Sequence, residues 1–177
     1  EQACALAPDN PEPLALAAEA FEAIGDIAKA CEYMERASNA APNDRTARIR
    51  LARLLRISHK LDEAEDVLSQ VSTGDDVSAP LLLEQARLRT ARQDHQGALK
   101  LYQKALGAAA DRLDTLLEMA HCAVAWHEYG EVLAECGLPT QVPDRHFLAT
   151  LHEHIAKFRP SPSLEARFRT TTARLLR

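Results

Sequence analysis

The stretch ACALAPDN at residues 3–10 returns as ASNAAPND at residues 37–44, an offset of 34 residues. The same offset links small side chains elsewhere in the chain, in three series: Ala18, Ala52, Ala86 and Ala120; Ala30, Ala64 and Ala98; and Ala37, Val71 and Ala105. Small residues at a fixed interval let helices approach closely at the same point of each unit. A period of this length indicates an array of similar helical units.

The composition favours helices along the whole chain. Of the 177 residues, 46% are hydrophobic and 27% are charged, with only 6 glycines and 5% aromatic residues. The commonest residues include Ala, Leu, Glu and Arg, which are strong helix formers. No run of strand length alternates β-branched and polar residues. The sequence therefore predicts an all-α fold.

The order of small, large and proline positions within this period resembles the tetratricopeptide repeat. Residues 11–44 match it best, through these positions: Leu14, Ala17, Ala18, Phe21, Gly25, Asp26, Ala30, Met34, Ala37 and Pro42. Pro42 cannot continue a helix, and Asp44 is suited to cap the next one. The resemblance implies a right-handed α-α superhelix, a tetratricopeptide solenoid, of about four helix pairs plus C-terminal helices.

The period divides the chain into six segments. Residues 1–10 form the tail of a preceding repeat, residues 11–44, 45–78 and 79–112 form one repeat each, and residues 113–142 form a degenerate repeat. Pro139 is expected to shorten the second helix of the degenerate repeat. Residues 143–177 are expected to form helices that either cap the open end of the array or lead into a further domain.

The sequence offers no reactive centre. It contains no phosphate-binding glycine loop, no GxSxG and no HExxH motif. The four cysteines, Cys4, Cys31, Cys122 and Cys136, have spacings that suit neither zinc nor a disulfide framework, and they are expected to be small buried side chains in a reducing compartment. We therefore expect no metal, no cofactor and no enzymatic activity in this segment.

Charge and hydropathy limit the partners. The net charge is −5, which argues against general nucleic-acid binding, and no apolar run is long enough for a membrane span. These features favour a cytoplasmic protein. Residues 144–177 carry seven basic and three acidic side chains, so their net charge is +4. This basic segment is either a docking surface or an ordinary solvated helix face.

The resemblance also implies where a partner binds, because the first helix of each tetratricopeptide pair lines the concave groove. Helical spacing then gives these groove residues: Leu16 and Glu19; Ile49, Arg50, Arg53 and Arg56; Leu83, Glu84 and Arg87; and Leu117 and His121. The row of arginines requires a counter-charge. Either Glu19, Glu22 and Glu84 supply it within the chain, or an acidic ligand does.

Three functions are consistent with these patterns. The leading one is a scaffold that binds a protein or peptide, with an acidic group held by the arginines. The resemblance also allows a non-catalytic arm of a larger bacterial sulfotransferase or glycosyltransferase. Self-association into a homo-oligomer through Phe147, Phe158 and Phe168 is the third. The carboxylate clamp of chaperone-binding tetratricopeptide domains is not expected, because Ala15, Glu19 and Glu84 replace its polar and cationic residues.

Overall fold

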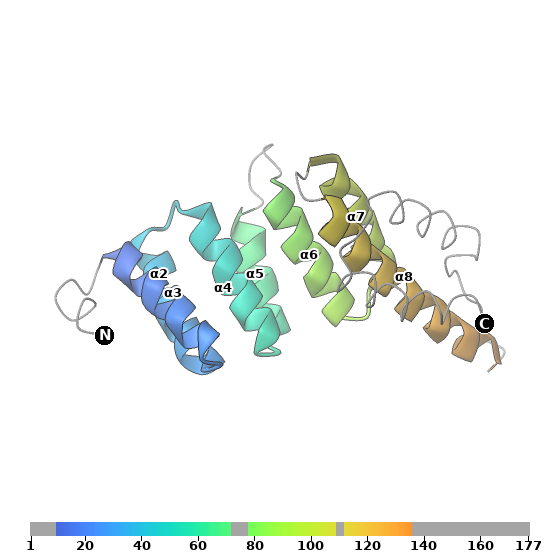
Figure 1. Cartoon of the computed structure of the whole chain (residues 1–177), viewed down its shortest axis with the longest axis horizontal. Helices are drawn as coiled ribbons and strands as arrows, with labels where there is room; N and C mark the ends of the chain where they lie inside the picture. The colour runs from blue at the N-terminus through green and yellow to red at the C-terminus, as the bar shows by residue number, and fades with distance from the viewer. Residues whose placement is uncertain (1–9, 72–77, 109–111, 136–177) are drawn as a thin grey trace. The chain divides into compact units, whose positions relative to one another are not determined.

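The computed structural model describes residues 10–71, 78–108 and 112–135, which form helices joined by short turns (Figure 1). The helices are α2 (Pro11–Ala23), α3 (Ile27–Ala40), α4 (Arg45–Ile57), α5 (Leu61–Val71), α6 (Ala79–Ala91), α7 (His95–Ala108) and α8 (Arg112–Glu135). No strand occurs within these described ranges. The prediction of an all-α fold is confirmed.

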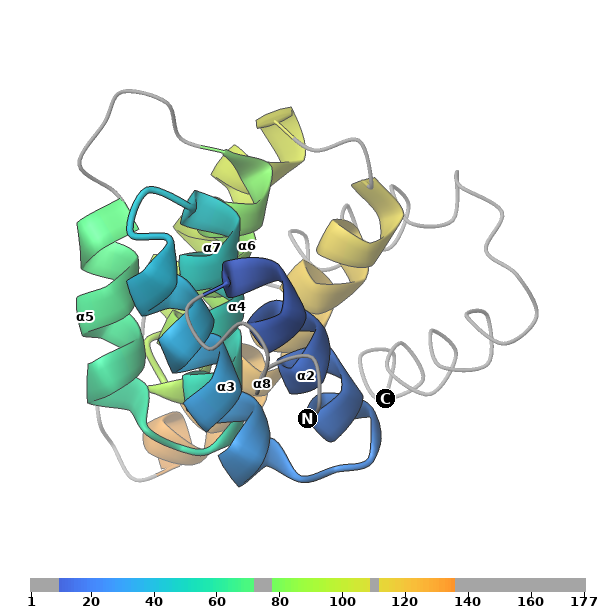
Figure 2. The same ribbon diagram turned by 90° about the vertical axis from the view of Figure 1, so that its left-hand side faces the viewer.

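The chain divides into two compact units, the first ending at Arg92 and the second beginning at Gln93. In the first unit α2 packs on α3, α3 on α4, and α4 on α5, while α6 contacts both α4 and α5. Figure 2 shows α5 at one edge of this unit and α2 at the other, with α3 and α4 between them. In the second unit α7 packs on α8.

The helices begin at the 34-residue interval seen in the sequence. The first helices of the pairs, α2, α4 and α6, start at residues 11, 45 and 79 and have 13 residues each. Asn10, Asp44 and Ser78 precede them at equivalent positions. The Asp44 carboxylate accepts hydrogen bonds from the N–H groups of Thr46 and Ala47, at 2.8 and 3.2 Å. The predicted cap of α4 is therefore confirmed.

The turn inside each helix pair requires a left-handed backbone at one position. Gly25, His59 and Gln93 occupy that position in three successive units, with φ of 83°, 59° and 65°. At Gly25 the N–H donates to the carbonyl of Glu22 at 3.0 Å, and the N–H of Asp26 donates to that of Phe21 at 2.9 Å. This hydrogen-bonding pattern is the Schellman motif, which ends a helix where a residue accepts positive φ.

The small residues of the repeat lie where helices touch. Ala18, Ala52 and Ala86, each the eighth residue of its helix, are 1%, 0% and 0% exposed. Ala30 and Ala64 are also fully buried, in the second helices of their pairs. An alanine at such a point lets two backbones approach closely, and larger neighbours then fill the remaining space. The core therefore repeats with the sequence.

Large side chains fill the space beside these alanines. Leu14 and Met34 are 1% and 2% exposed. The half-buried rings of Phe21 and Tyr33 stack between α2 and α3, with their centroids 5.2 Å apart. Such an offset pair adds to the stabilisation that its apolar burial provides.

The helix α8 departs from the repeat pattern. It runs for 24 residues without the turn that a tetratricopeptide pair has between its helices. Residues 113–129 contain neither glycine nor proline, so nothing in their sequence ends the helix at the expected place. The predicted repeat boundaries stay predictions. The segment 1–9, Pro139 and the predicted helices within 143–177 lie outside the described residues.

A candidate partner-binding groove on α4 and α6

A cavity of about 490 Å³ opens between α4 and α6 in the first unit. Its lining comes from Arg45, Thr46, Ile49, Arg50 and Arg53 on the α4 side, and from Ser78, Pro80, Leu83, Glu84 and Arg87 on the α6 side. Four pairs of these residues are 34 positions apart, for example Ile49 with Leu83 and Arg53 with Arg87. The cavity is thus lined by the same helix face of two successive units.

The apolar part of the lining comes from Ile49, Leu83 and Pro80. Ile49 and Leu83 are half-buried, so each presents part of its side chain to the cavity and part to the helix interface. A cavity of this size with an apolar lining and a few polar groups has the properties of an ordinary ligand site.

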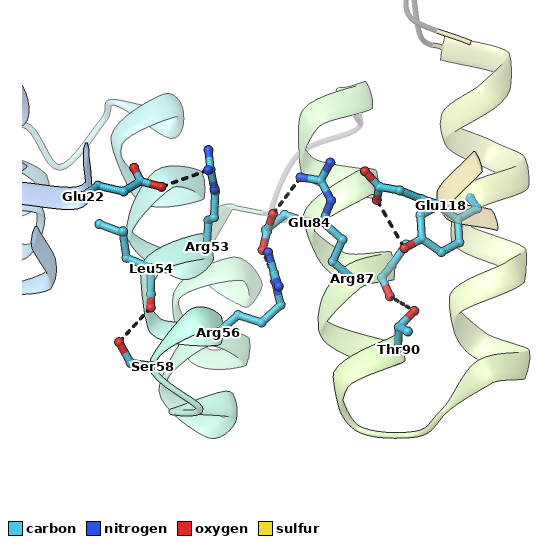
Figure 3. A network of polar contacts seen from close by, with 11 residues as sticks. Glu22, Arg53, Leu54, Arg56, Ser58, Glu84, Arg87, Thr90 and Glu118 are labelled. Carbon is cyan, nitrogen blue, oxygen red and sulfur yellow. Dashed lines mark hydrogen bonds and ion pairs between the residues drawn. The ribbon is translucent and has the colours of Figure 1, made fainter. Parts of the chain in front are cut away.

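Arginines of α4 make ion pairs with glutamates of α2. Arg50 pairs with Glu19, and Arg53 pairs with Glu22 at 2.9 Å (Figure 3). Three of these four side chains are about half exposed, so their charges are well solvated. The sequence left open whether glutamates of the chain or an acidic ligand would balance the arginine row. In this structure Glu19 and Glu22 both take part.

A third glutamate lies beneath the arginines and is buried. Glu84 is only 2% exposed, and its two carboxylate oxygens bind two different arginines. Arg56 donates from Nε at 2.6 Å, and Arg87 donates at 3.2 Å (Figure 3). A buried carboxylate is tolerated because both oxygens are paired. The contact with Arg56 joins α6 to α4, so Glu84 helps to fix the distance between the two walls of the cavity.

The structure brings most of the predicted groove residues together. Six of them line the cavity: Ile49, Arg50, Arg53, Leu83, Glu84 and Arg87. Glu19 and Arg56 lie beside it through their ion pairs. Leu16 is 60% exposed on α2, at the repeat position that Arg50 occupies on α4. Whether these residues bind a partner stays a prediction.

Two predicted residues belong to the second unit. Leu117 is half-buried and His121 is exposed, both on α8. They are therefore not part of the cavity formed by α4 and α6.

Sequence reasoning missed the end of the cavity formed by Arg45, Thr46, Ser78 and Pro80. These residues lie at the starts of α4 and α6, about one helical turn before Ile49 and Leu83. Extending the groove face by one turn toward each helix N-terminus would have found Thr46 and Pro80, because they have the spacing of 34 residues.

A buried pair in the second unit also escaped prediction. His95, at the start of α7, is 6% exposed, and its Nδ1 lies 3.7 Å from Sγ of Cys122 on α8. Burial lowers the pKa of His95, although the nearby Asp94 carboxylate opposes that shift. Cys122 is buried and Cys31 is half-buried, and both are free thiols. The prediction that the cysteines are buried holds for Cys122, while Cys4 and Cys136 lie outside the described residues.

The described ranges show two further features. They hold no group of three or more His, Cys, Asp or Glu side chains that could bind a metal ion. None of their helices is both long enough and apolar enough to cross a bilayer.

Paired helices of constant length, start and turn geometry define an α-helical repeat protein. A family model of the tetratricopeptide repeat matches residues 11–54, so this part of the chain is a member of that family. The predicted resemblance is confirmed. A search of curated protein sequences gives no match.

Solved structures share the fold. MamA from Desulfovibrio magneticus RS-1 superposes with a TM-score of 0.63 at 17% identity, covering 86% of this chain and 79% of that one. A tetratricopeptide repeat protein from Parabacteroides merdae gives 0.66 at 18% identity, covering 93% of this chain and 58% of that one. YrrB, described as a tetratricopeptide protein with an unusual peptide-binding site, gives 0.56 at 14% identity, covering 75% and 69%. At these identities the similarity shows the fold alone.

Proposed function

We propose that this protein is an interaction scaffold whose first unit binds a segment of a partner protein in the cavity between α4 and α6. The observation that carries the proposal is the combination of an apolar lining and arginine side chains in one open cavity. Ile49 and Leu83 bury an apolar side chain of the partner, and Arg50 and Arg53 hold an acidic group. The peptide-binding site named for YrrB supports this reading by analogy of fold.

The chemistry of arginine suits this role. A guanidinium has five N–H donors in a fixed fork, so an arginine already paired with one glutamate retains donors for a second acceptor. Peptides bound in this way bury a small area, and we expect dissociation constants on the order of micromolar for a single segment. The arginines then set the specificity for acidic partners, and the apolar contacts provide much of the affinity.

The test begins with capture of partners by the intact chain and continues with each partner as a purified protein. Reversing two groove charges, Arg50→Glu with Arg53→Glu, should weaken binding by at least about tenfold, because each reversal replaces an attraction with a repulsion. Lys100→Glu with Lys104→Glu is the matched control, since both lysines are exposed on α7 and the net charge changes equally.

Circular dichroism and thermal melting of both variants would verify that each remains folded. Equal binding by the wild type and the Arg50/Arg53 variant, with both proteins folded, would show that the partner binds elsewhere. The alternative of an arm in a larger enzyme stays a prediction from the sequence, and no described residue favours it.

A further inference from the structure

The groove arginines already bind carboxylates of their own chain. Arg50 and Glu19 are 48% and 47% exposed at their side chains, and Arg53 and Glu22 are 51% and 29% exposed. Ion pairs this open to solvent contribute little to stability, because water screens the charges and ordering two long side chains costs entropy. Each glutamate is therefore readily replaced by another carboxylate.

The pairing of Glu84 differs in kind. Its carboxylate is 2% exposed and is bound by Arg56 and Arg87, so removing it would leave charges without a counter-ion in a region poor in water. The structure thus separates two sets of ion pairs around one cavity. The Glu84 set is buried and fixes α6 against α4, whereas the pairs of Glu19 and Glu22 are solvated and exchangeable.

The spacing of the exchangeable arginines defines the shape of an incoming ligand. Arg50 and Arg53 are three residues apart on α4, which places their Cβ atoms about 5–6 Å apart on one helix face. In an extended peptide, side chains at alternate positions point the same way and lie about 6–7 Å apart. Two acidic residues at alternate positions therefore match the two arginines. An apolar residue two positions further along has the same orientation and can reach Ile49 and Leu83.

We infer that the natural occupant is an extended acidic segment of another protein, with carboxylates at alternate positions followed or preceded by an aliphatic side chain, and that it displaces Glu19 and Glu22 from Arg50 and Arg53. This inference rests on the proposed function and adds the partner class and the exchange. Carboxylates are chosen because the chain's own glutamates show that both guanidinium groups accept this group.

The exchange makes Glu19 and Glu22 specificity-determining residues. A ligand with one carboxylate displaces one glutamate and leaves the other pair intact, so it gains little over solvent. A ligand with two carboxylates restores both pairs and adds its apolar contact. The two glutamates therefore act as internal competitors that weaken the binding of every anion and exclude weakly acidic segments.

Fluorescence anisotropy with synthetic peptides tests the inference. The probe is a labelled peptide of glycine and serine that contains Glu-Ser-Glu-Ser-Leu, and its control contains Gln-Ser-Gln-Ser-Leu. The competitor-free protein is Glu19→Gln with Glu22→Gln. The matched control protein is Glu32→Gln with Glu35→Gln, because these glutamates are exposed on α3 and their removal changes the net charge equally.

We expect the wild type to bind the glutamate peptide more tightly than the glutamine peptide. The Glu19/Glu22 variant should bind the glutamate peptide about fivefold more tightly still, as expected from the loss of two weak competing pairs. The Glu32/Glu35 variant should stay within about twofold of the wild type, because its removed charges are on another helix.

The outcomes separate the two proposals. A wild type that prefers the glutamate peptide, with no gain in the Glu19/Glu22 variant beyond the control, would overturn the exchange and leave the proposed function standing. If neither the wild type nor the variants distinguish the two peptides, both proposals are overturned. Equal gains in both double variants would reduce the effect to net charge and would also overturn the exchange.

Discussion

The turn position shared by Gly25, His59 and Gln93 imposes one backbone conformation on three different residues. Only glycine adopts a positive φ without a steric cost from its side chain. At Gly25 an added Cβ would meet no atom within 4 Å, so the strain of any other residue there comes from the backbone alone. His59 therefore carries a conformational cost that Gly25 avoids.

Replacing His59 with glycine should stabilise the protein. We expect His59→Gly to raise the free energy of unfolding by about 0.5–1 kcal/mol, because relief of the left-handed strain exceeds the entropy that glycine adds to the unfolded chain. Urea denaturation followed by circular dichroism would measure it. The reciprocal change, Gly25→Ala, should lower the same quantity, and a loss of stability in His59→Gly would contradict the argument.

The buried carboxylate of Glu84 is the residue on which the cavity walls depend. Glu84→Ala leaves Arg56 and Arg87 without their shared counter-ion, and we expect the free energy of unfolding to fall by about 2 kcal/mol. The figure is moderate because both arginines are partly exposed and can turn to solvent. Thermal melting would measure the loss.

Glu63→Ala is the control for that experiment. Glu63 is 58% exposed, and its ion pair with Lys60 is solvated, so its removal should change stability by less than about 0.5 kcal/mol. An equal effect of the two substitutions would show that the burial of Glu84 contributes nothing.

At the scale of the helix, each alanine of the repeat marks a contact that admits no larger side chain. Ala52 is fully buried in α4, whereas Ala20 is exposed on α2. We expect Ala52→Leu to lower the free energy of unfolding by about 1–3 kcal/mol through overpacking. Ala20→Leu should change it by less than about 0.5 kcal/mol. Chemical denaturation of both variants would check this, and equal values would remove the packing argument.

The contact between α7 and α8 should depend on pH through His95. Burial lowers the pKa of His95 from its ordinary 6.5, so the folded state resists the proton that the unfolded state accepts. Stability from this group is complete above about pH 6.5 and is lost as the pH falls below that value. The free energy of unfolding of wild type should therefore decrease more steeply between pH 7 and pH 5 than that of His95→Gln.

His121→Gln serves as the control, because His121 is exposed on the same unit. Its pH profile should follow that of the wild type. Identical profiles for the wild type and both variants would show that His95 is protonated without a cost to folding.

The sequence predicted the features that recur and missed those that occur once. The positions of Ala18, Ala52 and Ala86 and the cap by Asp44 follow from the 34-residue period, because each repeats a local requirement of helix packing. The burial of Glu84 and the contact of His95 with Cys122 depend on how particular side chains meet in space. A single period carries no information about such meetings, so the sequence left the balance of the arginine row open.

The length of α8 marks the other limit of prediction. A repeat match predicts a turn wherever the period places one, yet α8 continues through that point because its residues all favour helix. The match of the family model to residues 11–54 is consistent with this trend, since the repeat is most regular at the beginning of the chain.

At the scale of the whole molecule, a repeat array is stabilised by contacts between neighbouring elements. Each helix of the first unit contacts only helices near it in the chain. Stability in such an array is approximately a sum of local terms, so a defect should loosen the elements around it more than distant ones. The two compact units of this chain allow a reciprocal test of that expectation.

The test uses one cavity-forming substitution in each unit. Leu68→Ala in α5 and Leu116→Ala in α8 both truncate buried leucines and should each cost about 2–4 kcal/mol. Amide hydrogen exchange followed by mass spectrometry should show faster exchange mainly in α4, α5 and α6 for the first variant, and mainly in α7 and α8 for the second. Equal acceleration of all helices by both variants would mean that the described residues unfold as one cooperative block.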